Sequence, residues 1–67
     1  MITIYNKNNE RENNKKTYVQ VELRGLAGDT KPTQLGEDYV DNGSIYIEID
    51  TGKIFFYDLE NELWKEV

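Results

Sequence analysis

Apolar and polar side chains alternate at every second position in two stretches of the chain. The first covers residues 17–24, and its apolar positions are Val19, Val21 and Leu23. The second starts at position 45, and its apolar positions are Ile45, Ile47 and Ile49. Strict alternation with many β-branched residues is typical of strands that bury one side. Both stretches are therefore predicted to be strands of one sheet, with these residues toward the core.

The second stretch continues into a predicted three-stranded antiparallel meander. A tight turn over 50–53, with Gly52 at the position that needs a positive φ, leads to a strand over 54–57. A polar turn over 58–62 then leads to a last strand over 63–67. These turns and strands account for the C-terminal third of the chain.

The length of the first turn predicts the register of the meander. A two-residue turn at Thr51-Gly52 places Ile49 opposite Ile54 and Ile47 opposite Phe56, on the core side. The other side then carries Tyr46 beside Tyr57 and Phe55 beside Glu48. The side occupied by Trp64 stays open, because the second turn has either three or four residues.

Two segments lack this alternation. A short strand is predicted at 2–5, and residues 6–16 after it contain five asparagines and no apolar side chain. Because nothing in 6–16 offsets the entropy of ordering the backbone, we expect a mobile loop there. Residues 25–43 hold the only proline and four of the five glycines. This long connection is expected to pack on the sheet through Leu26, Leu35, Tyr39 and Val40, before a turn at 41–43 restarts the sheet.

These elements together predict an all-β fold. No segment shows the 3.6-residue apolar spacing of a helix. Residues 1–67 are expected to form one small domain, an antiparallel sheet of four to five strands that ends in the three-stranded meander. A chain of this length buries only about 60% of the surface that its unfolded form exposes, so oligomerisation or docking on a larger partner would stabilise it.

Composition narrows the possible chemistry. The chain has no Cys and no His, which excludes disulfides, thiol nucleophiles, imidazole ligands and Ser-His pairs. Thirteen acidic against eight basic side chains give a net charge of −5. Such a balance disfavours direct nucleic-acid binding, which depends on Lys and Arg. No stretch approaches the roughly 20 apolar residues of a membrane span, and the first residues do not resemble a signal peptide. We expect a soluble protein inside the cell.

No motif in the chain carries catalysis or ligand binding. The glycine-containing segment 25–31 fails the Walker spacing and precedes no helix. The segment 38–43 begins like a calcium loop, but Val40 and Ile49 occupy positions that need ligands. Ser44, the only serine, has no base near it in sequence. We therefore expect no catalytic residue, no cofactor and no metal, and hence no enzyme.

The surface is more informative. If the isoleucine side fills the core, the other side of the sheet carries aromatic residues that either pack under the long connection or bind a partner, since Tyr and Trp are enriched in interfaces. The candidate interface residues are the aromatics Tyr18, Tyr46, Phe55, Tyr57 and Trp64 and the acids Glu48, Asp50, Asp58, Glu60, Glu62 and Glu66.

Several motifs resemble those of a group of very short bacteriophage proteins. Their opening is matched by Arg24-Gly25-Leu26, Gly28-Asp29-Thr30-Lys31-Pro32-Thr33 and Asn42-Gly43-Ser44. Their C-terminal signature is matched by Glu48-Ile49-Asp50-Thr51-Gly52-Lys53, Phe56-Tyr57-Asp58, Glu60-Asn61 and Trp64. The resemblance covers residues 17–67. Residues 1–16 depart from the pattern, and the spacer 34–41 is longer than usual.

This resemblance implies a β module of viral origin. Such proteins are typically encoded by phages of low-GC Gram-positive bacteria, often near virion structural genes, and a related meander occurs in longer phage fibre and head proteins. The resemblance does not imply any catalytic or ligand-binding residues. The leading hypothesis is a head or tail accessory protein that oligomerises or docks on a larger phage or host protein, located in the host cytoplasm during infection or in the virion.

Two alternatives remain open. One is an anti-defence or host-takeover inhibitor that binds a host protein through its acidic and aromatic surface. The other is a protein that sequesters a signalling nucleotide, with Tyr or Trp64 stacking on the base and Arg24, Lys31 or Lys53 contacting phosphates.

Overall fold

Seven β-strands and no helix make up the computed structural model, which describes residues 1–67. The strands are β1 (Thr3–Asn13), β2 (Lys16–Gly25), β3 (Gln34–Leu35), β4 (Asp38–Val40), β5 (Ile45–Glu48), β6 (Ile54–Asp58) and β7 (Leu63–Glu66). The predicted all-β class is confirmed, and Gly25 ends β2. The meander is also confirmed, since β5 pairs with β6 and β6 with β7, both antiparallel.

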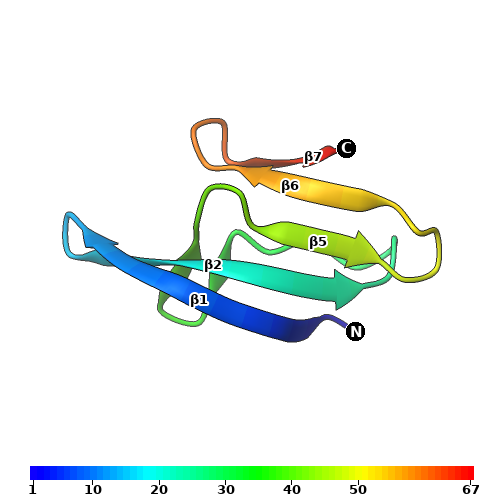
Figure 1. The fold of residues 1–67 in the computed structure, drawn as a ribbon, viewed down its shortest axis with the longest axis horizontal. Helices are drawn as coiled ribbons and strands as arrows, with labels where there is room; N and C mark the ends of the chain where they lie inside the picture. The colour runs from blue at the N-terminus through cyan, green and yellow to red at the C-terminus, as the bar shows by residue number, and fades with distance from the viewer.

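All strands belong to one curled, mixed sheet (Figure 1). The order along one path is β3-β4-β2-β5-β6-β7, and β1 pairs with β2 off this path. β2 runs parallel to both β4 and β5. The prediction of four to five antiparallel strands was therefore wrong in strand number and in direction. The long connection is the cause, because it carries the chain back along the sheet and so lets later strands run parallel to β2.

Residues 6–16, predicted to be a mobile loop, form most of β1 and the turn of a long hairpin instead. β1 pairs antiparallel with β2 from Thr3 to Asn13, with two register shifts. Asn14 and Lys15 make the turn, with φ angles of 52° and 64°. Every side chain of β1 is exposed, so burial of apolar surface does not hold this strand.

Polar contacts tie β1 to the rest of the molecule. The Arg11 guanidinium donates two hydrogen bonds, of 2.7 and 2.8 Å, to the Asp41 carboxylate, and Lys7 Nζ lies 2.7 Å from Asp38 Oδ2. The hydrogen bond from Arg11 lowers the pKa of Asp41. The loop prediction failed because it considered only apolar side chains as a source of order.

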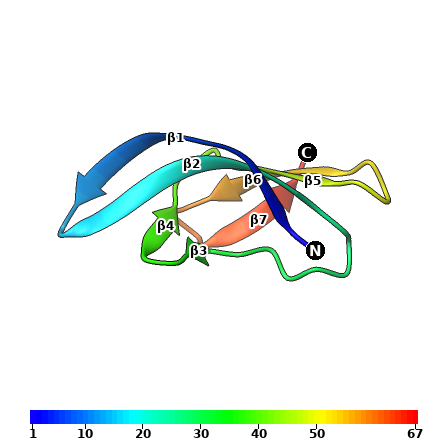
Figure 2. The ribbon, with the colours of Figure 1, turned by 90° about the horizontal axis from the view of Figure 1, so that it is seen from below.

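The long connection packs on the sheet, as predicted. β3 and β4 form a small antiparallel pair within it, Val40 is fully buried and Leu35 packs against the core. Tyr39 is half-buried, whereas the Leu26 side chain is 44% exposed and does not make the predicted contact. Figure 2 shows β1 and β2 along one side of the molecule and the connection along the opposite side.

The core lies on the side of the sheet that the connection covers. Its buried apolar residues are Val19, Val21, Leu23, Val40, Tyr46 and Tyr57. The valines and leucine of β2 therefore face inward as predicted. The meander is turned over relative to the prediction, because Tyr46 and Tyr57 lie inside while Ile49, Ile54 and Phe56 are exposed.

Polar atoms of the connection explain this choice of side. The Tyr46 hydroxyl donates to the Leu26 carbonyl at 3.0 Å, and the Trp64 indole N–H donates to the Pro32 carbonyl at 2.9 Å. With their polar tips satisfied, these large rings can be buried. The isoleucine side has no covering segment and remains outside.

The register of β5 and β6 also differs from the prediction. Ile47 pairs with Ile54, and Ile45 with Phe56, a shift of two residues. The turn is longer than two residues because Glu48 organises it: the Glu48 N–H donates to the Lys53 carbonyl and the Glu48 carbonyl accepts from the Gly52 N–H. A shift of two keeps each side chain on its side of the sheet.

Candidate interaction surface

Four of the five predicted interface aromatics lie in or against the core: Tyr46 and Tyr57 belong to it, and Phe55 and Trp64 pack against it, whereas Tyr18 lines a surface hollow. Tyr46 is 0% exposed and Tyr57 is 3% exposed, and Tyr18, Phe55 and Trp64 are half-buried. The Trp64 ring lies 5.0 Å from Tyr57 and 6.0 Å from Tyr46 between centroids, on the same side of the sheet. Of the two possibilities left open by the sequence, the structure has the one in which the connection covers these rings.

Glu48 is the most buried of the predicted acidic residues. Its carboxylate accepts hydrogen bonds from Lys31 Nζ at 2.8 Å and from Thr51 Oγ1 at 2.6 Å. The Lys31 ammonium also lies over the Phe55 and Tyr46 rings, 4.2 and 4.7 Å from their centroids. The bond from Lys31, followed by that from Thr51, lowers the pKa of Glu48. Both charged groups are satisfied within the chain, so this pair is a structural feature rather than a reactive one.

The other predicted acidic residues are partly engaged within the chain as well. Asp58 lies 3.3 Å from Lys65, Glu66 lies 3.8 Å from Lys53, and Asp50 accepts the Ala27 N–H at 3.0 Å. The Asn61 amide and backbone, more than Lys65, lower the pKa of Asp58. Glu60 and Glu62 are exposed and form no ion pair. The acidic surface available to a basic partner is thus smaller than the charge count indicates.

The three basic residues of the nucleotide alternative are also paired. Arg24 binds Glu22 at 3.0 Å and stacks over Tyr5 at 3.7 Å, and Lys31 and Lys53 pair with Glu48 and Glu66. A phosphate would have to compete with these contacts.

The opposite side of the meander is an apolar surface without a covering element. We call it the outer face; it consists of Ile45, Ile47, Ile54, Phe56, Leu63 and Val67. Strand alternation and the pairs Ile47–Ile54, Ile45–Phe56 and Asp58–Leu63 place these side chains together. Phe56 is 45% exposed and Val67 is 76% exposed. Apolar side chains gathered in this way on a small domain are typical of interaction sites.

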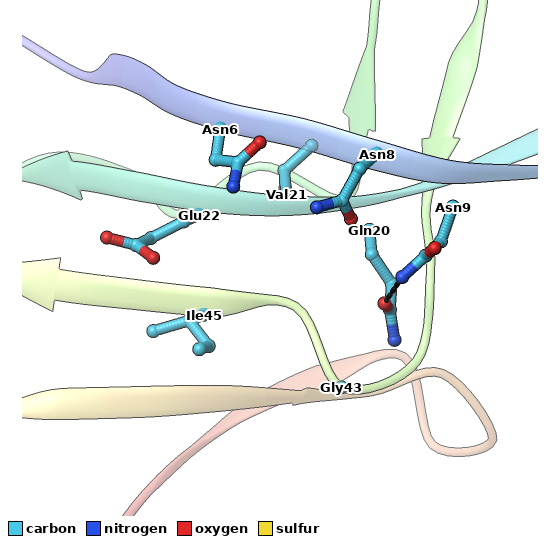
Figure 3. Close-up of a pocket in the computed structure, with 8 residues that line it drawn as sticks. All are labelled: Asn6, Asn8, Asn9, Gln20, Val21, Glu22, Gly43 and Ile45. Atoms are coloured by element: carbon cyan, nitrogen blue, oxygen red, sulfur yellow. Dashed lines mark hydrogen bonds between the residues drawn. The ribbon is translucent and has the colours of Figure 1, made fainter.

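Beside the outer face, towards β1, the surface is hollowed and lined by amides. Figure 3 shows this groove, of about 200 Å³, with its lining residues. They are Asn6, Asn8, Asn9, Gln20, Val21, Glu22, Gly43 and Ile45. Gln20 is fixed there, because its amide accepts from Asn9 at 2.6 Å and donates to the Asn42 carbonyl at 3.1 Å. Ile45 belongs to both the groove and the outer face.

A second hollow, of about 190 Å³, is lined by three tyrosines, Tyr18, Tyr39 and Tyr57, together with Lys16, Thr33, Leu59 and Glu62. These two hollows are smaller than the roughly 300–1,000 Å³ of most small-molecule sites. A third, of about 370 Å³, reaches that range; it is lined by Arg11, Asn42, Asp58, Leu59 and Glu60, of which only Leu59 is apolar. No three His, Cys, Asp or Glu side chains are grouped so that they could hold a metal ion.

Four residues of the outer face, Ile45, Ile47, Ile54 and Phe56, were assigned to the core from the sequence alone. Both sides of β5 and β6 are apolar, so the alternation could not show which side is covered. The signal that could have identified the covered side is the presence of Tyr46 and Trp64 together with a long connection. Rings with a polar tip need hydrogen-bond partners when they are buried, and the connection supplies them.

Comparisons with protein-family models, curated proteins and solved structures find no match to this chain. The structure contains no helix that is long and apolar enough to span a membrane.

Proposed function

We propose that this protein is a non-enzymatic protein-interaction module of a bacteriophage, a virion-associated accessory protein that oligomerises or docks through its outer face. One observation carries this proposal: apolar side chains lie exposed together on one side of the meander, without a covering element. Phe56 and Val67 are 45% and 76% exposed, next to exposed Ile54 and Leu63.

The arrangement of charges supports the same function. Most charged groups that could attract a ligand are tied to each other, in seven ion pairs that include the buried Lys31–Glu48 pair. Covering an apolar surface with another molecule, by contrast, lowers the free energy and so favours binding. The virion role rests on the phage resemblance of residues 17–67. Most of the charged side chains on which the inhibitor and nucleotide alternatives depend are already bound within the chain, Glu60 and Glu62 excepted, and we favour the accessory module.

The composition of purified particles tests the proposal. Virions of the parent phage are purified and their proteins quantified by mass spectrometry relative to the major capsid protein. We expect this chain at many copies per particle. Phe56→Asp should be lost from particles, whereas Leu26→Asp, which changes a residue of equal exposure outside the outer face, should be retained. Absence of the unmodified chain from particles would overturn the virion role.

A further inference from the structure

One row of side chains across the outer face has charges of opposite sign at its two ends. Register pairs connect Glu22 to Ile45, Ile45 to Phe56 and Phe56 to Lys65. Directly paired residues point to the same side of a sheet, so the row reads acid, apolar, apolar, base from β2 to β7. Lys65 is the more accessible end, with 61% of its side chain exposed, against 28% for Glu22.

The outer face is also electrically neutral, although the chain carries −5. The four charged side chains that border it on β2, β6 and β7 form two ion pairs, Arg24 with Glu22 and Lys65 with Asp58. The whole net charge therefore lies on other surfaces. Two copies that met through their acidic surfaces would repel each other, whereas two outer faces can meet without this repulsion.

We propose that the outer face binds a second copy of the same chain, in a two-fold symmetric dimer whose axis runs parallel to the strands. This inference rests on the proposed function, since it names the partner of the same surface. Rotation about this axis places the row of one subunit over the row of the other in reverse order. Ile45 then packs against the partner subunit's Phe56, and Glu22 faces the partner subunit's Lys65; each of these contacts occurs twice.

The dimensions of sheets fit this arrangement. Strands lie about 4.8 Å apart, so three spacings separate the two ends of the row by about 14 Å, wide enough to enclose two apolar strand positions. Facing sheets pack about 10 Å apart, within about 30° of parallel. Extended Glu and Lys side chains can meet across such a gap at the rim, while the apolar positions interdigitate in the middle.

The area is modest. A stable specific interface buries about 800 Å² per partner, and this would be roughly a sixth of the 4557 Å² surface of the chain. Six apolar positions and a charged rim are few for an interface of that size, so we expect a dimer that dissociates on dilution.

Edge-to-edge pairing through β1 is a poorer route to the same dimer. β1 has a long free edge, but register shifts interrupt its ladder between Ile4 and Asn6 and between Asn8 and Arg11. Asn9, within the second shift, has a φ of 52°. Such irregularities protect an edge strand from pairing with another chain.

Charge reversal at the two ends of the row tests the inference. The mass of the purified chain is measured by sedimentation equilibrium from about 1 μM to about 1 mM. We expect it to rise from 7.9 kDa towards twice that value. Glu22→Lys and Lys65→Glu should each weaken self-association about tenfold, because each places like charges opposite one another across the axis. An equimolar mixture of the two variants should associate as tightly as the unmodified chain, because both contacts are then attractive.

Two outcomes would overturn the inference. One is an unmodified chain that remains monomeric at about 1 mM. The other is a mixture of the two variants that associates no better than either variant alone. Circular dichroism of each variant confirms that it is folded, and Leu26→Ser serves as the matched control for Phe56→Ser, which should abolish dimerisation.

The two proposals can fail separately. A monomeric chain whose Phe56→Asp variant is nonetheless lost from virions would show that another protein covers the outer face. A charge-dependent dimer that is absent from virions would keep the dimer and overturn the virion role.

Discussion

At the residue scale, Gly25 and Tyr46 form the tightest contact at the end of the core. Gly25 is buried at the end of β2, and a Cβ added there would overlap the Tyr46 hydroxyl and press on Ile2. The same hydroxyl donates to the Leu26 carbonyl at 3.0 Å. The φ angle of Gly25 is not in the left-handed region, so the backbone conformation does not require glycine here. Glycine is needed because a larger residue has no space.

Gly25→Ala should therefore destabilise the fold by about 1–3 kcal/mol, the usual cost of overpacking. Tyr46→Phe alone should cost about 1 kcal/mol for the lost hydrogen bond. The double variant should cost clearly less than the sum, because Phe removes the atom that an alanine Cβ would meet. Urea unfolding followed by Trp64 fluorescence measures all three. Gly28→Ala, with no atom within 4 Å of the added Cβ, is the control, and additive costs would contradict the clash.

The buried Lys31–Glu48 pair gives a second prediction at this scale. Lys31→Met keeps a chain of similar length over the rings of Phe55 and Tyr46 but leaves the Glu48 carboxylate without its main partner. We expect the pKa of Glu48 to rise and Tm at pH 7 to fall by about 5 °C or more. Lys53→Met, which breaks a pair that is half-exposed on both sides, should change Tm by less than about 2 °C. Equal shifts in the two variants would show that the burial of the pair is unimportant.

At the scale of elements, the β1–β2 hairpin shows how polar residues specify a strand. Its turn residues Asn14 and Lys15 both have positive φ, the geometry of a type I′ turn. Asparagine suits this geometry, whereas lysine does so only at a cost. Both turn residues are exposed, so the backbone preference of the turn can be tested with little change in side-chain packing.

Lys15→Gly should stabilise the protein by about 0.5–1 kcal/mol, because glycine adopts φ near 64° without strain. The same change at Glu12, an exposed strand position paired with Thr17, should destabilise it by a similar amount. Thermal unfolding of the two variants shows whether each change raises or lowers the stability. Destabilisation by both would mean that the turn is not under strain.

Sequence reasoning succeeded for elements whose signals are local. The turn with Gly52, the end of β2 at Gly25 and the three strands of the meander follow from neighbouring residues, and all three are present. It failed where the outcome depends on distant residues. Whether the isoleucine side or the aromatic side of the meander lies inside depends on the carbonyls of Leu26 and Pro32, which are far away in the chain and accept hydrogen bonds from Tyr46 and Trp64. The outer face was therefore missed, although all its residues had been assigned to strands.

At the scale of the whole molecule, stability should depend on pH at both ends of the range. Local hydrogen bonds and cations lower the folded-state pKa of Asp29, Asp41, Glu48 and Asp58. Groups whose pKa is lowered on folding stabilise the protein above their ordinary values of 3.8 and 4.5, and this contribution is lost as the pH falls through the lower folded values. Burial raises the pKa of Tyr46 and Tyr57, so their contribution is present below their ordinary value of 10.0 and lost above it.

We therefore expect a plateau of stability between about pH 5 and about pH 10, with a loss on either side. Urea midpoints measured across this range test it. Asp41→Asn should lower the plateau and flatten the acid limb, because one of the four carboxylates no longer contributes. A urea midpoint that increases on acidification below about pH 4 would contradict the predicted direction of the pH dependence.

The parallel pairing of β2 has a kinetic consequence. The hairpins β1–β2 and β5–β6 join neighbouring segments and can form within about 1–10 μs, but Glu22 reaches Ile45 only after the whole connection has closed. Closure of this long loop is therefore the slow step of folding. Until it is complete, the β5–β6 hairpin exposes isoleucines on one side and aromatic rings on the other. The chain is then at its most prone to aggregate, and fast synthesis at high temperature should reduce the yield of soluble protein more than the stability of the folded state suggests.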